Sequence, residues 1–357
     1  MYKVKEKSIL MIGVGLDVKG GVATVEKLML ANTPPEIKYT FIGTLCSSGG
    51  KFRKSAYFIK KLGKVLESLS KSPNIVHIHF SQKGSFFRKL IVIYLCNIFK
   101  ASVVIHAHGS EFDKFFNKLP RPIKFIAQRT FGKSRVLICL SEKWAEFYRK
   151  AFNMPPENVK VIYNPVGIPQ IDNKESSHMV KLIGLGRIGK RKGVYDLIDA
   201  VALIKEEVRK SIKIVWHGDG EIREANEYAL SRGVEHHFDF KSWIGDTEKK
   251  NLLKSADIFV LPSYDEGLPM ALLEAMSYSI PVITTNVGGI PEVISSGTEG
   301  ILLTPGDIIS LKVAIEDLAK NRDLRQSMGE NGRRASEQLD ITSYMLRIRN
   351  IYSEITI

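Results

Sequence analysis

Cysteine is scarce in this 357-residue chain, and long apolar runs are missing. The three cysteines, Cys46, Cys96 and Cys139, are widely spaced and form no pair typical of a metal site, which indicates a reducing compartment. The apolar run Leu90–Cys96 is far shorter than the roughly 20 residues of a membrane span. Ile9–Val14 follows three lysines but lacks the cleavage site of a signal peptide. We therefore expect a cytoplasmic protein.

Positive charge is concentrated in the first half of the chain. Residues 1–170 contain 28 Lys and Arg against 10 Asp and Glu, a net charge of +18, whereas residues 171–357 contain 24 against 28, a net charge of −4. This asymmetry indicates that the basic half meets either a nucleic acid or a membrane surface. Because no nucleic-acid-reading motif accompanies the charge, we expect an anionic membrane surface as a partner and no nucleic acid.

Three stretches of the basic half combine aromatic residues with Lys and Arg, namely Phe52–Lys71, Phe86–Lys100 and Phe112–Lys133. In the first stretch, apolar residues at helical spacing form one stripe and basic residues occupy other faces. Such a helix can lie on an anionic bilayer, although an ordinary helix with solvated lysines has the same pattern. We expect the protein to be peripheral at the inner face of the cytoplasmic membrane.

Short apolar runs alternate with stretches of helical period along the whole chain. This alternation is typical of an α/β protein in which helices cover both faces of parallel sheets. The expected strands are Ser8–Val14, Tyr39–Ile42, Ile75–Phe80, Ser102–His106, Val136–Leu140, Val159–Ile162, Lys181–Leu185, Lys213–Trp216, His237–Phe240, Ile258–Leu261, Val282–Thr284 and Ile301–Leu303. Expected helices include Ala23–Leu30, Val194–Glu207 and Met270–Tyr278.

The chain length favours two domains. Asn164-Pro165 and Pro169 break regular structure, and the polar stretch Asp172–His178 follows. We expect a basic first domain at 1–168, a second domain at 169–340 and a final helix within 341–357 that packs back toward the first domain. Two doubly wound sheets joined in this way leave a cleft, with binding loops at the carboxyl ends of the strands.

A glycine-rich basic turn follows the expected strand at Lys181. Glycines allow a ligand to approach the backbone closely, and the following helix offers free N–H groups. Arg187 adds a bidentate donor and Lys192 a point charge, a combination suited to a diphosphate. The match of Gly184, Gly186 and Gly189 to a dinucleotide fingerprint is weak on its own. A solvated basic turn is the alternative.

Two glutamates lie after the expected strand Ile258–Leu261. Glu266 stands before Gly267-Leu268-Pro269, at the start of a helix that proline suits. Glu274 lies inside that helix among apolar residues, where a carboxylate requires a hydrogen-bond partner. Ribose hydroxyls are one such partner, and an ordinary buried glutamate is the alternative.

Histidines and further glycines follow other expected strands. Gly20-Gly21 gives a flexible loop with N–H groups available to an anion, and His108 stands at a strand end. His77 and His79 are two residues apart on a strand and share a face, but a metal site needs further ligands. Structural or substrate-positioning histidines are therefore favoured, and we expect no metal.

Taken together, these segments resemble the retaining glycosyltransferases of family 4, which have the two-domain GT-B fold. The resemblance covers nearly the whole chain, and the matching pieces occur in family order. They are Lys19-Gly20-Gly21-Val22, Val76-His77-Ile78-His79, His106-Ala107-His108-Gly109, Ser141-Glu142, Asn164-Pro165, Gly186-Arg187, Lys192-Gly193, Gly218-Asp219-Gly220, Ala256-Asp257, Pro262-Ser263 and Glu266-Gly267-Leu268-Pro269 with Glu274.

The resemblance implies a nucleotide diphosphate sugar, UDP- or GDP-linked, as donor substrate, with no cofactor. Arg187 and Lys192 would hold its diphosphate, and Glu274 its ribose. Glu266 with Gly267, Leu268 and Pro269 would hold hydroxyls of the transferred sugar.

The remaining residues implied by the resemblance surround the sugar and the base. His108 would lie near C6 of the sugar and the reaction centre, and Gly20 and Gly21 would close over the donor. Gly218 also belongs to the implied donor site. Trp243, Ile244 and Asp246 correspond to the stretch near the base, where Lys241-Ser242 stands in place of the usual glycine.

The expected chemistry is transfer of a hexose-type sugar by a metal-independent, retaining reaction. His108, Glu266, Arg187 and Lys192 are the expected catalytic residues, and no Asp-x-Asp motif stands at a strand-end loop. The expected acceptor is a glycan or a polyprenyl-diphosphate-linked sugar in bacterial surface-polysaccharide assembly. The alternatives are a glycoside hydrolase or phosphorylase that uses Glu266 and Glu274, and a non-enzymatic anion-binding protein at a membrane surface.

Overall fold

The computed structural model describes residues 6–171 and 179–355, and the chain divides into two compact units. Unit 1 consists of Met1–Pro165 and Ile341–Ile357, and unit 2 of Val166–Asp340. The division lies after Pro165, whereas the sequence analysis placed the boundary at 168, and the final helix is grouped with unit 1. The expected polar linker Asp172–His178 lies outside the described residues.

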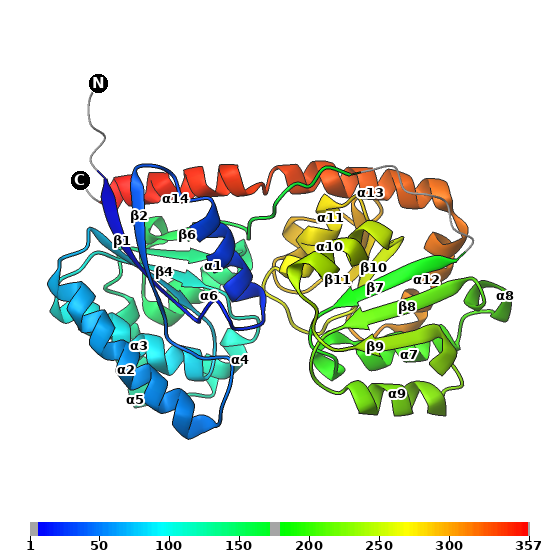
Figure 1. Ribbon diagram of the computed structural model, residues 1–357, viewed down its shortest axis with the longest axis horizontal. Coiled ribbons are helices and arrows are strands. Elements are labelled where there is room, and N and C mark those ends of the chain that lie inside the picture. The colour runs from blue at the N-terminus through cyan, green and yellow to red at the C-terminus, as the bar shows by residue number, and fades with distance from the viewer. Residues whose placement is uncertain (1–5, 172–178, 356–357) are drawn as a thin grey trace. The chain divides into compact units, whose positions relative to one another are not determined.

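Unit 1 is built on a parallel sheet of six strands in the order β2-β1-β3-β4-β5-β6, with helices on both faces (Figure 1). The strands are β1 Lys7–Gly13, β2 Ile37–Gly43, β3 Ile75–Phe80, β4 Val103–Ala107, β5 Val136–Cys139 and β6 Val159–Val161. The helices are α1 Gly21–Ala31, α2 Lys51–Ser70, α3 Gly84–Ile98, α4 Phe112–Asn117, α5 Arg121–Phe131, α6 Glu142–Phe152 and α14 Ile341–Ile355.

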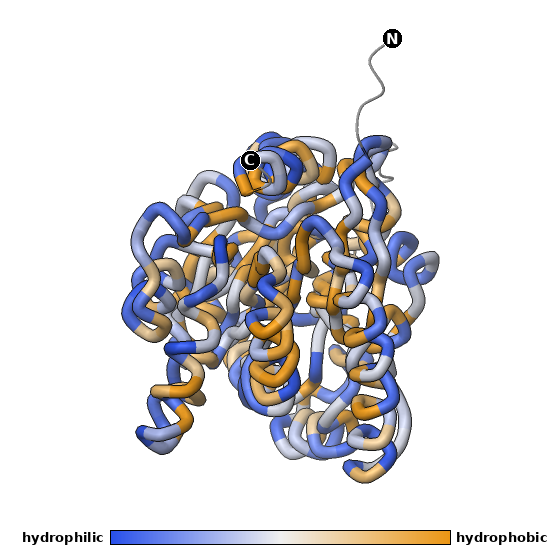
Figure 2. The backbone as a smooth tube through the Cα atoms, turned by 90° about the vertical axis from the view of Figure 1, so that its left-hand side faces the viewer, coloured by the Kyte–Doolittle hydropathy of each residue, from blue (hydrophilic) through white to orange (hydrophobic). Residues whose placement is uncertain are grey.

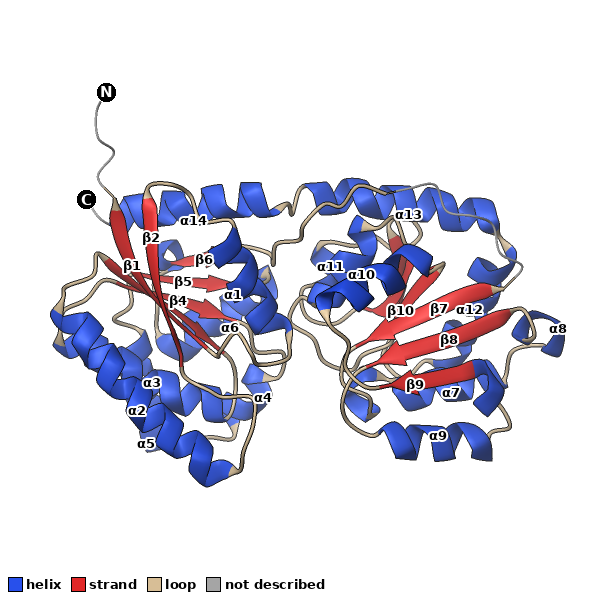
Figure 3. Cartoon of the chain, viewed as in Figure 1, coloured by secondary structure: helices blue, strands red, loops and turns tan. Residues whose placement is uncertain are grey.

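Unit 2 repeats the architecture with a parallel sheet in the order β12-β11-β10-β7-β8-β9 (Figure 3). The strands are β7 Val180–Leu185, β8 Ile212–His217, β9 Phe238–Lys241, β10 Ile258–Leu261, β11 Val282–Thr285 and β12 Gly300–Leu303. The helices are α7 Val194–Ala202, α8 Glu206–Arg209, α9 Ile222–Ser231, α10 Asp246–Ser255, α11 Met270–Ser277, α12 Ile308–Lys320 and α13 Arg322–Glu337. All twelve expected strands are present, and the predicted fold class is confirmed.

One expected helix ends early, and one of the mixed aromatic and basic stretches is divided into two helices. The helix predicted at Val194–Glu207 ends at Ala202, because the N–H of Lys205 donates to Glu316 Oε1 on α12 (3.1 Å) instead of continuing the helical ladder. The stretch Phe112–Lys133 forms two helices, α4 and α5, with Pro120 between them. Proline lacks an N–H and clashes with the preceding turn, so it ends one helix and begins the next.

Aromatic packing fixes the helices of unit 1 against one face of its sheet. Phe80 of β3 meets Phe112, Phe131 and Phe152 of α4, α5 and α6, and the rings of Phe131 and Phe152 are stacked with centroids 4.5 Å apart. All four are fully buried. Buried aromatic pairs of this kind add stabilisation beyond the area that they remove from water.

A buried lysine and glutamate tie together the carboxyl ends of β1 and β2. Lys89 of α3 donates to Gly13 O (2.6 Å) and Thr44 Oγ1 (2.8 Å), and the Glu26 carboxylate of α1 accepts from the N–H of Val14 (3.0 Å). Burial lowers the pKa of Lys89 and raises the pKa of Glu26, while their mutual attraction opposes both shifts. These contacts anchor the base of the loop that ends at Gly20.

Four histidine rings are stacked on β3, β4 and the residue after β4. His77, His79 and His106 are fully buried, and the rings of His106 and His108 lie 4.2 Å apart between centroids. Tyr352 of α14 contacts the first of them through a hydrogen bond between its OH and His77 Nδ1 (2.5 Å). Helix α14 therefore attaches to unit 1 partly through this stack.

Burial keeps these four imidazoles neutral. It lowers the pKa of His77 and of His108 to about 3 and lowers the pKa of His79 and His106 well below the usual value. A charged imidazolium would lose its hydration in this environment, so the folded unit does not take up protons near neutral pH.

We expect the stability of the protein to fall as the pH drops below about 6.5, the ordinary pKa of histidine. Between that pH and about pH 5, the unfolded chain binds protons that the stacked histidines of the folded chain do not, so the free energy of unfolding decreases. Each histidine contributes a slope of at most about 1.4 kcal/mol per pH unit. Urea unfolding at several pH values measures the slope.

The matched variants for this experiment are His77→Phe and His236→Phe, because His236 is an exposed histidine. The slope of the free energy of unfolding against pH should decrease in His77→Phe by the contribution of about one bound proton, and it should stay unchanged in His236→Phe. Comparing variants separates the histidines from carboxylates that titrate in the same range. Equal slopes for His77→Phe and the parent would contradict the prediction.

Candidate functional site

The point where the strand order of unit 2 reverses lies between β7 and β10. These neighbours pair in parallel, with Leu182 opposite Ile258, and successive strands extend outward from them on both sides. The carboxyl ends of strands at such a reversal form the usual ligand site of an open α/β sheet. The glycine-rich basic turn leaves β7 here, and the segment that contains Glu266 leaves β10.

Close backbone packing joins the loops that follow β7 and β10. Gly193 has a φ of +69°, and a Cβ there would lie 2.0 Å from Pro262 O, so a side chain at this position is excluded. The N–H of Tyr264 donates to Arg191 O (2.9 Å), and Arg191 Nη1 donates to Asp265 O (2.8 Å). The basic turn is therefore held in place by the β10 loop and is not a freely solvated segment.

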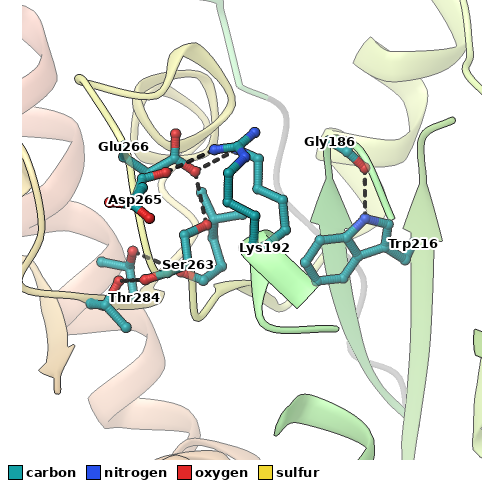
Figure 4. A network of polar contacts seen from close by, with 10 residues as sticks. Gly186, Lys192, Trp216, Ser263, Asp265, Glu266 and Thr284 are labelled. Carbon is teal, nitrogen blue, oxygen red and sulfur yellow. Dashed lines mark hydrogen bonds and ion pairs between the residues drawn. The ribbon is translucent and has the colours of Figure 1, made fainter. Parts of the chain in front are cut away.

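Lys192 and Glu266 form an ion pair at the centre of these loops (Figure 4). Both side chains are largely buried, with 11% and 7% of their surfaces exposed. Ser263 Oγ donates to the same oxygen, Glu266 Oε1 (2.8 Å), and Thr285 Oγ1 donates to Ser263 O (2.6 Å). An ammonium has three N–H donors, so Lys192 can bind an anion while it contacts Glu266.

Arg187 is an exposed cation of the same turn, as is Lys190. No salt bridge joins its guanidinium to another residue within the described part of the chain. The neighbouring backbone is fixed, because the N–H of Ile188 donates to Asp219 O (2.7 Å) and the N–H of Glu221 donates to Ile188 O (3.0 Å). Arg187 thus offers an unpaired planar donor on an ordered loop, as binding of a diphosphate requires.

The β11 loop closes on the segment from Glu266 to Pro269. Gly289 N–H donates to Gly267 O (2.6 Å), and a Cβ on Gly288, where φ is +60°, would lie 2.1 Å from Glu266 O. Leu268 is buried with 3% of its surface exposed, and Pro269 immediately precedes α11. The four predicted residues therefore lie in a rigid turn between two strand-end loops.

Glu274 has a partner that the sequence analysis missed. Lys249 of α10 donates to Glu274 Oε1 (2.6 Å). Burial raises the pKa of Glu274, and the attraction and hydrogen bond of Lys249 lower it in part. The carboxylate on α11 is thus stabilised within the protein, and it keeps a second oxygen that can accept a hydrogen bond.

The predicted residues near the base lie in the same unit. The Gly218 N–H donates to Lys241 O (3.0 Å), which holds the β8 loop against the end of β9. Trp243 is exposed to 37%, Ile244 is half-buried, and Asp246 is the first residue of α10. Trp216, at the end of β8, contacts the start of the β7 loop, because its Nε1 donates to Gly186 O (2.9 Å; Figure 4).

Unit 1 holds the other predicted site residues. Gly20 has a φ of +135° and precedes α1, which begins at Gly21. His108 follows β4 and forms a hydrogen bond with His79 between Nε2 and Nδ1 (2.9 Å). The predicted site residues therefore form two groups. Those between Arg187 and Glu274 belong to unit 2, and Gly20, Gly21 and His108 belong to unit 1.

His77, His79 and His106 each place one ring nitrogen within 4.8 Å of the others. His106 is the ligand candidate that the two-residue spacing of His77 and His79 did not reveal. His77 has no ring nitrogen left for a cation, because its Nδ1 contacts the OH of Tyr352 and its Nε2 contacts His106 Nδ1. Structural or positioning roles for the histidines thus remain our prediction.

Two family models match the chain in succession. The model "Glycosyltransferase Family 4" matches residues 29–168, and "Glycosyl transferases group 1" matches residues 171–335. The two matches correspond to the main parts of unit 1 and unit 2. The matches cover every strand of the unit 2 sheet and every strand of the unit 1 sheet except β1, and the loop that contains Gly20 lies before the first match.

Individual relatives match over shorter segments. An uncharacterized glycosyltransferase of Methanocaldococcus jannaschii, MJ1178, is 30% identical over 62% of this chain and 60% of its own length. The putative colanic acid biosynthesis glycosyltransferase WcaL of Salmonella typhimurium is 28% identical over 54% of this chain and 50% of its own. The chain thus spans only about half to three fifths of the length of these curated relatives.

Solved structures match nearly the whole chain. Anabaena HepE in complex with UDP and glucose has a TM-score of 0.78 at 17% identity and covers 98% of this chain and 100% of its own. The glycosyltransferase WaaG, involved in lipopolysaccharide biosynthesis, has a TM-score of 0.70 at 19% identity and covers 96% and 99%. These likenesses show the GT-B fold, and with the two family models they establish that the chain belongs to the group 1 glycosyltransferases of the family 4 type.

Proposed function

We propose that this glycosyltransferase moves a hexose-type sugar, with retention of the anomeric configuration, from a nucleotide diphosphate sugar to a glycan or a polyprenyl-diphosphate-linked acceptor. The observation that carries the proposal is that the strand reversal of unit 2 brings together two cations, Arg187 and Lys192, with the carboxylate of Glu266, which forms an ion pair with Lys192. Cations suit the diphosphate, and Glu266 and Glu274 suit the hydroxyls of sugar and ribose.

The two cations supply the charge that departure of a nucleoside diphosphate requires. Negative charge develops on the leaving phosphate as the glycosidic bond breaks, and donors that are already in place stabilise it without reorganisation. Lys192 is held by Glu266, and the Arg187 turn is held by backbone hydrogen bonds. The reaction proceeds by attack on the same face as the leaving group, assisted by its phosphate, with no metal ion.

The contacts of the two glutamates disfavour the hydrolase and phosphorylase alternatives. Paired catalytic carboxyls must flank one glycosidic bond from two sides. Glu266 instead accepts from Ser263 and Lys192, and Glu274 accepts from Lys249. Each carboxylate thus has its own cationic partner, which suits binding of hydroxyl groups rather than attack on a sugar.

The names of the related proteins support a particular class of donor and acceptor. HepE has been crystallised with UDP-glucose, and the related names include colanic acid biosynthesis and a lipopolysaccharide glucosyltransferase. These names support a UDP-linked hexose as donor and surface-polysaccharide assembly as the pathway, and a GDP-linked hexose is the other donor included in the proposal. The reaction then takes place in the cytoplasm, at the inner face of the membrane that carries the acceptor.

The proposal predicts that nucleotides stabilise the protein selectively. In a thermal-shift panel of UDP, GDP, ADP, UDP-glucose and GDP-mannose, the matching nucleotides should raise Tm, because a ligand of the native state stabilises it by about 2.7 kcal/mol at 100 times its Kd. Inorganic phosphate and free glucose are the controls. Failure of every nucleotide to raise Tm, combined with phosphorolysis of a glycan, would favour the phosphorylase alternative instead.

We expect Arg187→Ala to lower kcat by about 100-fold or more, since one preorganised donor to a developing charge contributes about 2.7–4 kcal/mol. The fold should be unaffected because the side chain is exposed. The matched control is Arg223→Ala on α9, an exposed arginine paired only with Glu227 among the salt bridges of the described residues. Undiminished transfer by Arg187→Ala would refute the role of this charge.

Membrane association belongs to the same proposal and rests on unit 1. Helices α2, α3 and α5 pack beside one another and expose apolar side chains between lysines and arginines. Figure 2, which colours the backbone by hydropathy, shows hydrophobic and hydrophilic residues interspersed along the helices. The exposed apolar residues are Phe52, Ile59, Leu66, Phe87, Ile91, Tyr94, Ile98, Phe125 and Ile126. No described helix is both long and apolar enough to cross a bilayer.

The basic charge and the exposed apolar residues together fit the surface of an anionic membrane. Lysines near such a surface contribute about 1 kcal/mol each, and the apolar side chains enter the boundary between headgroups and acyl chains. Phe52 and Ile59 are exposed to 89% and 68% on α2. Exposure of large apolar side chains to water is unfavourable, and their insertion into the membrane interface removes this unfavourable contact.

In liposome flotation, we expect the protein to float with vesicles that contain anionic lipid at low salt. The pair of changes Phe52→Ser and Ile59→Ser should reduce the floating fraction several-fold, and 0.5 M salt should reduce it as well, because both contributions are needed. Leu230→Ser, at a residue of unit 2 that is 63% exposed, is the control. Absence of flotation at low salt would contradict this part of the proposal.

A further inference from the structure

His79 and His108 form a hydrogen-bonded pair at the carboxyl ends of β3 and β4. His79 Nδ1 lies 2.9 Å from His108 Nε2, and the two rings are stacked with centroids 5.2 Å apart. His79 is fully buried, whereas His108 is half-buried. The other nitrogen of His79, Nε2, is buried and has no hydrogen-bond partner among the described residues.

The proton on His79 has two possible positions, and they differ in cost. A neutral imidazole carries one N–H and one acceptor nitrogen. A proton on Nε2 would be a buried N–H without an acceptor, a situation that folded proteins rarely contain. With the proton on Nδ1, this N–H donates to His108 Nε2, and His79 Nε2 keeps only a lone pair without a partner. The second arrangement is therefore favoured.

The neighbouring pair follows the same pattern. His106 Nδ1 lies 3.4 Å from His77 Nε2, and His106 Nε2 is buried without a partner in the described chain. If His106 donates through Nδ1, then His77 accepts at Nε2 and its own Nδ1–H donates to the OH of Tyr352. In both pairs, the ring whose Nε2 lacks a partner donates through its Nδ1.

We propose that His79 is a positioning residue that fixes the tautomer of His108, so that His108 presents its Nδ1–H as a hydrogen-bond donor to a substrate oxygen. This inference rests on the proposed glycosyl transfer. Since His79 Nδ1–H occupies His108 Nε2, the proton of a neutral His108 must lie on Nδ1. His108 then donates to an oxygen of the sugar substrate and does not act as a general base.

The low pKa of His108 supports this role. Burial lowers that pKa to about 3, so the ring stays neutral across the range in which an enzyme operates. A general base needs a pKa near the working pH. The rate of transfer should therefore show no inflection from histidine near pH 6.5.

Two variants of His79 separate donation from packing. In His79→Asn the amide nitrogen is the same number of bonds from Cα as Nδ1 and can still donate to His108, whereas His79→Leu fills space without a donor. We expect His79→Leu to lower kcat/KM for the nucleotide sugar about tenfold, the equivalent of one hydrogen bond, and His79→Asn to retain most of it. Tm shifts with the nucleoside diphosphate alone should be equal in both variants, because that ligand lacks the sugar.

The tautomer is measured directly on the parent protein by long-range ¹H–¹⁵N NMR of ¹⁵N-histidine-labelled chain, with the His108 signal assigned from a His108→Gln variant. The expected result is a protonated Nδ1 and a bare Nε2 on His108. A protonated Nε2 would overturn the inference whether or not the variants fold. Equal loss of kcat/KM in His79→Asn and His79→Leu would overturn it as well. Because the NMR result does not depend on transfer, its failure is distinct from failure of the proposed function.

Discussion

The parallel pairing of β7 with β10 is the constraint on which the candidate site depends. It places the carboxyl ends of two strands side by side, so that the loops that follow them meet although Lys192 and Glu266 are 74 residues apart in the chain. Everything else at the site is built outward from this contact. The β8 loop packs on the β7 loop, and the β11 loop packs on the β10 loop through Gly288. The backbone of the site is therefore already rigid, as electrostatic stabilisation of a transition state requires.

The sheet was predictable because buried parallel strands are apolar on both faces. Each of the twelve strands appears in the sequence as a short apolar run between helical stretches, and β3, for example, is buried along its whole length. The helix at Val194 was predicted too long because its end depends on a hydrogen bond from Lys205 to Glu316 of α12. Such a contact between distant segments leaves no local pattern in the sequence.

The candidate site shows the same division between local and distant information. Motifs near strand ends located Arg187, Lys192 and Glu266, because glycines and charges after a buried strand are a local signal. The pairing of Lys192 with Glu266, and of Lys249 with Glu274, was not foreseen. Lys192, Glu266 and Glu274 were singled out as candidate ligand contacts and Lys249 was not singled out, whereas the fold pairs each of these glutamates with a lysine that neutralises its charge. His106 escaped for a related reason, since its approach to His77 depends on the register between β3 and β4.

The ion pair between Lys192 and Glu266 changes how the two cations of the turn divide their work. Glu266 offsets much of the charge of Lys192, and the burial of both side chains makes their separation costly. Arg187 is exposed and lies on a backbone held by the β8 loop. In the proposed reaction, Arg187 would therefore offer more net positive charge to the leaving diphosphate than Lys192, which would serve as a fixed donor whose position is set by Glu266. On this view Glu266 acts on both substrate groups: it can accept from sugar hydroxyls directly, and it orients the lysine that meets the phosphate.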